Sequence, residues 1–178
     1  QIEANLLKKM KKYLEQEVQQ ACELAHAFET KLIRGFSFYH PRGTDPREHL
    51  PQVVDQLGKI AETCHRSDLI FGLELEANLV GQSGSLLAEI HRQVDHPALM
   101  LIFDGANIVT MGYSADECLQ QFREMKAGLG WLHIKDYRHP HPAKKTDHVD
   151  EEALKHFVPA DRGDTGHEAI LRDFRDAI

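Results

Sequence analysis

The chain has 178 residues, of which 42% are hydrophobic and 28% are charged, and its formal net charge is −7. This composition excludes a disordered chain, and the length suits a single domain with one core. No run of about 18 apolar residues is present, so we expect no membrane-spanning segment. The negative charge argues against a general nucleic-acid-binding protein.

The three cysteines lie far apart and form no CxxC pair. Such a set predicts neither a disulfide framework nor a cysteine-built zinc site, and it favours a reducing compartment. The first residues also lack the apolar core of a signal peptide. We therefore expect a cytoplasmic protein.

The chain begins with an alternation of amphipathic helices and short apolar strands. Apolar residues at three- and four-residue steps predict a helix over residues 1–30, and residues 32–39 have the composition of a strand. A second helix is predicted over 46–65, with Asp45 as its N-cap and Pro46 at its first position.

The same alternation continues to the C-terminus. A strand is predicted over 69–77 and a helix over 85–94. Residues 98–107 are almost wholly apolar until an acidic end, which is typical of a strand buried on both faces of a parallel sheet. A helix over 114–129 begins with SADE, the spacing of a capping box, and a strand over 130–137 follows. The last residues form a final helix.

Equivalent points on successive strands lie one βα unit apart, with 28 residues from Glu76 to Asp104 and 29 from Asp104 to His133. Repeated βα units predict a parallel sheet, so the fold class is α/β. No GxGxxG or GxxxxGK[ST] segment follows a strand, which argues against a dinucleotide or P-loop site. Polar residues at the carboxyl ends of several strands are instead typical of a (β/α)8 TIM barrel.

Four strands are about half of a TIM barrel. The first residue is Gln, and the chain begins and ends within predicted helices. We therefore interpret residues 1–178 as one incomplete barrel domain that lacks the first strands and the eighth strand. Such a half barrel would expose two strand edges and half of an apolar lumen. Within it we expect Trp131 in the core, with stacking on a sugar as the alternative.

Three strand ends carry side chains that could bind a metal. Residues at i and i+2 of a strand share a face, so Glu74 and Glu76 point the same way. If that face lines the lumen, Glu76, Asp104 and His133 lie at one depth on neighbouring strands. Two carboxylates and an imidazole suit Mn²⁺, Mg²⁺ or Co²⁺, with Zn²⁺ as a further candidate. Taken singly, each carboxylate could be a solvated strand end and His133 a core histidine.

Three segments of the chain resemble the xylose-isomerase-like sugar phosphate isomerase/epimerase family of TIM barrels: ELEAN at 74–78, LIFDGAN at 101–107 and LHIKD at 132–136. The resemblance extends over roughly residues 30–178. It implies that Glu76, Asp104 and His133 are metal ligands and that the eighth strand supplies a further Glu. It favours Glu76 over Glu74, because E-x-N stands where this family often has E-N-H.

The resemblance implies a metal-dependent isomerase or epimerase that acts on a sugar or sugar phosphate. Such a reaction moves a proton next to a carbonyl through an enediolate. Glu76 is then the candidate base, and Lys135 the candidate partner of the developing oxyanion. Further residues after the strands are candidates for substrate binding: His40, Arg42, Asn107, Asp136 and Arg138. For Asp136, the alternative is that it orients Lys135 or a loop.

Two alternatives stay open. An inositol-type dehydratase on the same barrel would begin with the same proton abstraction. A barrel that binds a sugar without turnover would result if the eighth-strand ligand were replaced by an apolar residue. The expected partner is a small carbohydrate, not a nucleic acid or a membrane. The polar N-terminal helix is a candidate interface for a homo-oligomer, with a solvated face as the favoured interpretation of its KKMKK run.

Overall fold

The computed structural model describes residues 11–140, 143–146 and 148–175. Its main sheet has four parallel strands in the order β1-β2-β3-β4, which is also their order in the chain. The strands are β1 (Leu32–Phe36), β2 (Ile70–Glu74), β3 (Leu99–Asp104) and β4 (Leu129–His133). This arrangement confirms the α/β prediction and the repeated βα unit.

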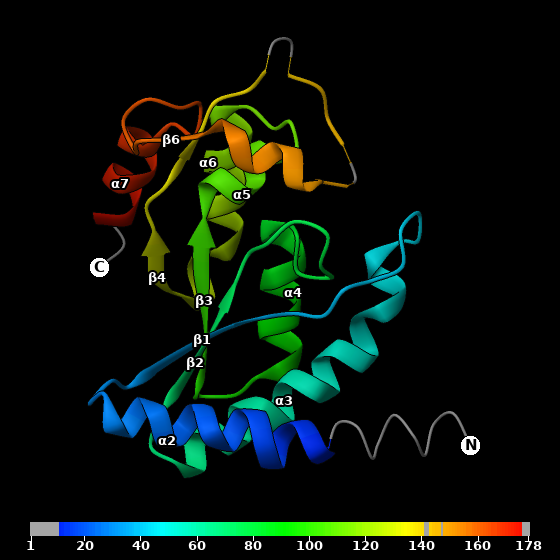
Figure 1. Ribbon diagram of the computed structural model, residues 1–178, viewed down its shortest axis with the longest axis vertical. Coiled ribbons are helices and arrows are strands. Elements are labelled where there is room, and N and C mark those ends of the chain that lie inside the picture. Colours follow the sequence, from blue (N-terminus) through cyan, green and yellow to red (C-terminus); the bar gives the residue numbers. More distant parts are fainter. Residues whose placement is uncertain (1–10, 141–142, 147, 176–178) are drawn as a thin grey trace.

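Helices connect the strands, and a small second sheet follows them (Figure 1). The π-helical turn η1 (Leu14–Val18) leads into α2 (Gln19–Ala27), and the 3₁₀ turn η2 (Pro46–His49) leads into α3 (Leu50–Arg66). They are followed by α4 (Gly84–Val94), α5 (Gly105–Thr110), α6 (Ala115–Met125), η3 (Lys126–Gly128), η4 (Glu151–His156) and α7 (His167–Arg175). The antiparallel pair is β5 (Asp136–Tyr137) and β6 (Phe157–Val158).

The predicted helix caps are present. Asp45 accepts a hydrogen bond from the backbone N–H of Arg47, with Pro46 at the first position, although the first turn is 3₁₀. Ser114 and Glu117 form both hydrogen bonds of a capping box at the start of α6. Of the helix predicted over 1–30, residues 1–10 lie outside the described residues.

One face of the main sheet forms the core. Residues paired in a parallel register point to the same side, and the outward-facing side chains of β2 and β3 are buried against α3, α4 and α6. These side chains are Phe71, Leu73, Leu99, Leu101 and Phe103. No helix in the described part of the chain is long and apolar enough to span a membrane.

The other face of the sheet is partly open. Arg34 and Phe36 of β1 are exposed, and Trp131 of the edge strand β4 is 51% exposed. The expectation that Trp131 lies in the core is therefore wrong for this structure. No described strand pairs with the outer edge of β4, so nothing covers the indole as a closed barrel would. The open face matches the half lumen expected from the sequence.

All four predicted strands end three or four residues earlier than expected, and the structure explains two of these ends. The strand predicted over 98–107 stops at Asp104, because the Asp104 carboxylate caps α5 by accepting the N–H of Asn107. The strand predicted over 130–137 leaves the main sheet after His133 and resumes in β5, which pairs with β6 instead. Both breaks lie at the carboxyl ends of the strands.

The helices α4 and α6 approach each other closely at Gly84. A Cβ atom at this position would lie 2.2 Å from the carbonyl oxygen of Gln121. The N–H of Gly84 also donates to the side-chain oxygen of Gln121 at 2.9 Å. The close contact of the two helices thus depends on the missing side chain.

We predict that Gly84→Ala lowers the free energy of unfolding by about 1–3 kcal/mol, because the backbone of Gln121 cannot move away cheaply. Gly58→Ala is the matched control, since a Cβ atom at Gly58 within α3 would meet nothing within 4 Å. That change should stabilise the protein by about 0.5–1 kcal/mol. Denaturant titration of both variants measures the difference, and equal effects would contradict the close contact.

Candidate metal centre

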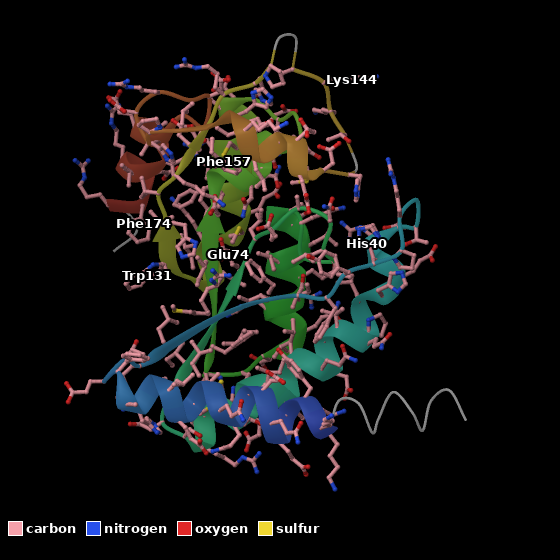
Figure 2. All side chains as sticks on the ribbon, in the orientation of Figure 1. His40, Glu74, Trp131, Lys144, Phe157 and Phe174 are labelled. Atoms are coloured by element: carbon pink, nitrogen blue, oxygen red, sulfur yellow. The ribbon has the colours of Figure 1, made fainter. Side chains whose placement is uncertain are left out.

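Two carboxylates and one imidazole meet at the carboxyl ends of β2, β3 and β4. His133 Nδ1 lies 2.8 Å from Glu74 Oε1 and 3.7 Å from Asp104 Oδ2. One ligand atom from each of the three residues lies within 4.8 Å of the other two. The strand register explains the arrangement, because Asp104 is paired with His133 and both point to the open face. Figure 2 labels Glu74 among the strands of the main sheet.

The structure brings Glu74, and not the predicted Glu76, to His133. The strand β2 ends at Glu74, so the alternation of faces no longer holds two residues later. Glu76 is half-buried beside the centre, where its Oε1 accepts the N–H of Ala77 at 2.8 Å and its Oε2 accepts the Asn107 side-chain amide at 3.2 Å.

Both carboxylates of the centre are buried and incompletely satisfied. The side chains of Glu74 and Asp104 are 4% and 1% exposed. Glu74 Oε2 and Asp104 Oδ2 have no hydrogen-bond partner. They form ion pairs with Arg34 Nε and Lys135 Nζ, both at 3.2 Å, and His133 Nδ1 lies 3.7 Å from Asp104 Oδ2. Buried oxygens of this kind need a compensating charge or ligand. Two such oxygens and an imidazole fit a divalent cation.

Burial raises the pKa values of two carboxyl groups at the centre, Asp104 and Glu76. Burial raises the pKa of Asp104 to about 6, with Lys135 opposing the rise and Glu74 adding to it. Burial also raises the pKa of Glu76, against the hydrogen bond from Ala77 and the attraction of Lys135. Carboxyl groups with raised pKa values in a cleft are typical of functional sites.

Asn107 supports the centre from within the protein. It is buried on α5, and its side-chain amide donates to the carbonyl of Leu75 at 2.9 Å and to Glu76 Oε2. Both amide hydrogens thus bind protein atoms, and a contact of Asn107 with substrate stays a prediction. Asn107 orients Glu76.

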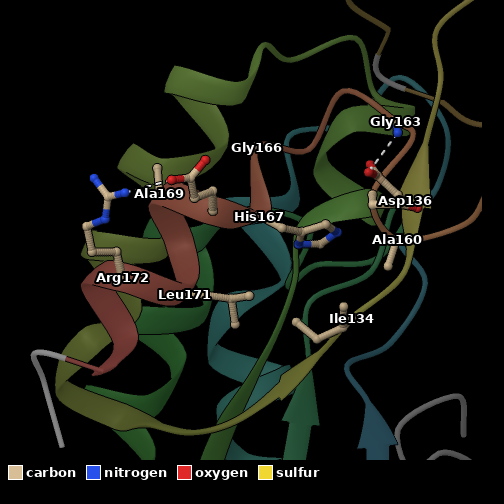
Figure 3. Close-up of a pocket in the computed structure, with 11 residues that line it drawn as sticks. Ile134, Asp136, Ala160, Gly163, Gly166, His167, Ala169, Leu171 and Arg172 are labelled. Carbon is tan, nitrogen blue, oxygen red and sulfur yellow. Dashed lines mark hydrogen bonds and ion pairs between the residues drawn. The ribbon is translucent and has the colours of Figure 1, made fainter.

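Asp136 is also occupied by the protein. Its carboxylate accepts the backbone N–H groups of Tyr137, Gly163 and Thr165 at 2.9, 2.8 and 3.1 Å. Burial alone would raise the pKa of Asp136, but the hydrogen bonds from Thr165 and Gly163 outweigh it and lower the pKa. The alternative interpretation, that Asp136 orients a loop, is therefore the one this geometry supports. The bond to Gly163 is visible in Figure 3, beside an open pocket of about 910 Å³ against α7.

The structure places Lys135 at the centre, but not the remaining predicted substrate residues. Lys135 Nζ contacts Asp104 and lies 5.0 Å from the centre of the Phe157 ring. His40 binds Thr44 within its own loop, and Figure 2 shows it well apart from Glu74. Arg42 is exposed on that loop, and the Arg138 side chain donates to the carbonyl of Arg162. Their substrate contacts stay predictions.

Arg34 is the residue that the sequence analysis missed. Its side chain is the charged one in the otherwise apolar strand LIRGF, and it points to the same face as Glu74. A charge within a strand of this composition was the available signal, because a cation on the lumen side of a barrel needs a buried partner.

Comparison with known families decides the assignment of the fold. A family model described as xylose isomerase-like TIM barrel matches residues 6–177. The chain belongs to this family. The expected resemblance is confirmed, while a search of the curated proteins found no significant match to this sequence.

Solved structures of xylose isomerase-like barrels share the fold at low sequence identity. A xylose isomerase domain protein from Planctomyces limnophilus has a TM-score of 0.72 at 19% identity, with 90% of this chain and 54% of that chain covered. IOLI protein with a bound zinc atom has a TM-score of 0.73 at 14% identity, with 91% and 55% covered. The probable 3-DHS dehydratase AsbF from Bacillus anthracis has a TM-score of 0.70 at 19% identity, with 90% and 59% covered.

Other similar structures include a Mycobacterium smegmatis barrel in complex with magnesium and a D-tagatose 3-epimerase-like protein. The chain spans somewhat more than half the length of the three structures compared above. It therefore forms part of a xylose isomerase-like barrel, and the solved structures with a similar fold include a probable dehydratase and an epimerase.

We predict that Asp104→Asn stabilises the protein at pH 7 in the absence of divalent metal. The folded state holds the Asp104 proton more tightly than the unfolded chain, so this stabilisation is full below the ordinary pKa of an aspartate and is lost as pH rises through about 6. Removing the ionisable group should therefore raise the free energy of unfolding at pH 7 by about 1–3 kcal/mol. Chemical unfolding at several pH values measures it.

Asp136→Asn is the control of opposite sign. The pKa of Asp136 is lowered, so its stabilisation is present above the usual Asp value and is lost as pH falls through the lowered pKa. This variant should be less stable than the parent at pH 7. If both variants shift stability in the same direction, the assigned environments of the two carboxylates are wrong.

Proposed function

We propose that this protein is a metal-dependent isomerase or epimerase of a sugar or sugar phosphate, in which a proton is moved next to a carbonyl. The observation that carries the proposal is the cluster of the buried Glu74 and Asp104 with the partly exposed His133, and the half-buried Glu76 beside it. Mn²⁺, Mg²⁺ or Co²⁺ suit the oxygen-rich set, and Zn²⁺ is a further candidate. Similar structures with magnesium and zinc support a divalent ion.

Glu74, Asp104 and His133 would hold the ion. When bound, it would polarise the substrate carbonyl and stabilise negative charge on the substrate oxygens. The two buried carboxylates at the carboxyl ends of β2 and β3 would also fix the position of the ion, since the sheet and α5 hold their side chains.

Glu76 is the proposed base. Its carboxylate stands outside the ligand cluster, and burial raises its pKa toward the range in which a carboxylate accepts protons well. The amide of Asn107 holds one carboxylate oxygen, while a second lone pair on each oxygen stays available for the substrate proton.

Lys135 is the proposed donor to the developing oxyanion. Its ammonium group lies at the centre between the Asp104 carboxylate and the Phe157 ring, which limits its motion. A fixed cation next to a forming oxyanion lowers the barrier, because the charge need not reorganise during the reaction.

A dehydratase is the second candidate, because proton abstraction next to a carbonyl also begins an elimination. AsbF, a probable 3-DHS dehydratase, has a similar fold and supports this alternative. The two reactions differ in the product: an isomer or epimer keeps the substrate's composition, whereas a dehydratase releases water. A barrel that binds a sugar without turnover is the third outcome.

We predict that Glu74→Gln and Glu76→Gln separate metal binding from proton transfer. Glu74→Gln should weaken Mn²⁺ binding by at least the roughly 10- to 100-fold that is typical of outer-shell substitutions, because it removes a ligand charge. Glu76→Gln should retain Mn²⁺ but lower the exchange of substrate protons in D₂O by about 10²- to 10⁴-fold. Calorimetry and NMR over a panel of ketoses and ketose phosphates measure the two effects.

Glu124→Gln, on the exposed side of α6, is the matched control and should change neither quantity. Loss of Mn²⁺ in Glu76→Gln with full retention in Glu74→Gln would reverse the two roles. If Mn²⁺ binds but no ketose exchanges a proton or loses water, the binding barrel replaces the enzyme as the better interpretation.

A further inference from the structure

Arg34 projects from β1 into the space beside the candidate metal centre. It is paired with Gly72 in the register of β1 and β2, and Glu74 is two residues further along β2. Its side chain therefore reaches diagonally along the open face, where Nε lies 3.2 Å from Glu74 Oε2. The same side chain is 47% exposed, so its far end faces the open side of the sheet.

The guanidinium group is held in place but not saturated. Its central carbon lies 4.5 Å from the centre of the Phe36 ring, a cation–π contact that fixes the plane of the group. Within the described part of the chain, Nε is ion-paired with Glu74, and neither terminal nitrogen takes part in a hydrogen bond. A planar guanidinium with two free terminal nitrogens matches a carboxylate or phosphate group.

The charge balance also changes when a divalent ion binds. Without the ion, the carboxylates of Glu74 and Asp104 are matched by the cations Arg34 and Lys135. Among the described residues, a divalent ion would leave a net charge of about +1 with Glu76 ionised, and the further Glu expected from the eighth strand would balance it. The ion would also compete with Arg34 for Glu74, which frees Nε for another acceptor. A carboxylate or phosphate on a polyol could then bind the guanidinium, which a neutral polyol matches less well.

We propose that Arg34 is a specificity-determining residue that makes the centre selective for an anionic polyol, whose carboxylate or phosphate binds the guanidinium. This inference rests on the proposed function and narrows its substrate class. The carboxylate of a sugar acid and the phosphate of a sugar phosphate share the chemistry that Arg34 recognises. The polyol hydroxyls would face the metal ligands, and the charged end would lie toward β1.

The test compares three unreactive probes on the full-length protein loaded with Mn²⁺. Sorbitol is neutral, gluconate carries a carboxylate, and sorbitol 6-phosphate carries a phosphate. Calorimetry should show at least one anionic probe binding about tenfold or more tightly than sorbitol, the difference expected for a charge-assisted pair. The probe with the higher affinity identifies the source of the charge.

Arg34→Gln should remove this preference and leave the affinity for sorbitol unchanged. Arg34→Lys should retain part of it, because the charge remains without the two-pronged geometry. Arg47→Gln is the control, since Arg47 is also about half exposed and pairs with Glu89 at 2.7 Å on the helical surface. It should bind all three probes as the parent does.

A purely structural role for Arg34 predicts a different result. If Arg34 only orients Glu74, Arg34→Gln weakens Mn²⁺ binding, whereas under our proposal Mn²⁺ affinity stays the same or rises. No preference for either anion in the parent, or a preference that survives Arg34→Gln, overturns the proposal and leaves the proposed isomerase intact. Failure of the parent to bind Mn²⁺ overturns the proposed function and this inference with it.

Discussion

The parallel register of β2, β3 and β4 is the constraint on which the candidate centre depends. Asp104 lies opposite His133, and Glu74 ends the neighbouring strand, so backbone hydrogen bonds set the places of all three side chains. The buried side chains on the other face of the sheet keep this register from slipping. Two carboxylates can therefore stay close together despite their repulsion, which is how a rigid scaffold prepares a binding site.

The same centre lowers the stability of the folded protein, because it buries charged carboxylates. Asp104 has its carboxylate buried with an unsatisfied oxygen, and its pKa is raised because burial disfavours the charge. Arg34 and Lys135 offset part of that cost, and both are exposed enough to exchange their partners for a ligand. Unfavourable local electrostatics of this kind are common at functional sites, where the rest of the fold supplies the compensating stability.

Much of the fold could be predicted from hydrophobic patterns, because the βα repeat is a property of long segments. The order of elements, the parallel sheet and the capping box of α6 follow from it. The differences lie where single residues leave a strand: the sequence does not show that β2 ends at Glu74, and the E-x-N resemblance favours Glu76, whereas the structure brings Glu74 to His133. Asn107 is a second example: the sequence places it at the end of a strand, whereas in the structure it lies in the helix α5. Asp104, His133 and Lys135 could be identified because each stands at or just after a strand end.

The pairing of β5 with β6 ties together the two ends of a long excursion of the chain. Arg138 donates its backbone N–H to the carbonyl of His156, so the segment between them begins and ends at one fixed point. Between these ends the segment is also held by hydrogen bonds from Thr146 to Met111 and between Val149 and Asn78. Residues can be inserted at low cost in the stretches between these contacts, since doubling a loop costs only about 0.6 kcal/mol in closure entropy. Lys135 directly precedes β5, so a change of length within this segment would leave its position unchanged. This segment is thus where homologous barrels can diverge in length and sequence while retaining a common reaction centre.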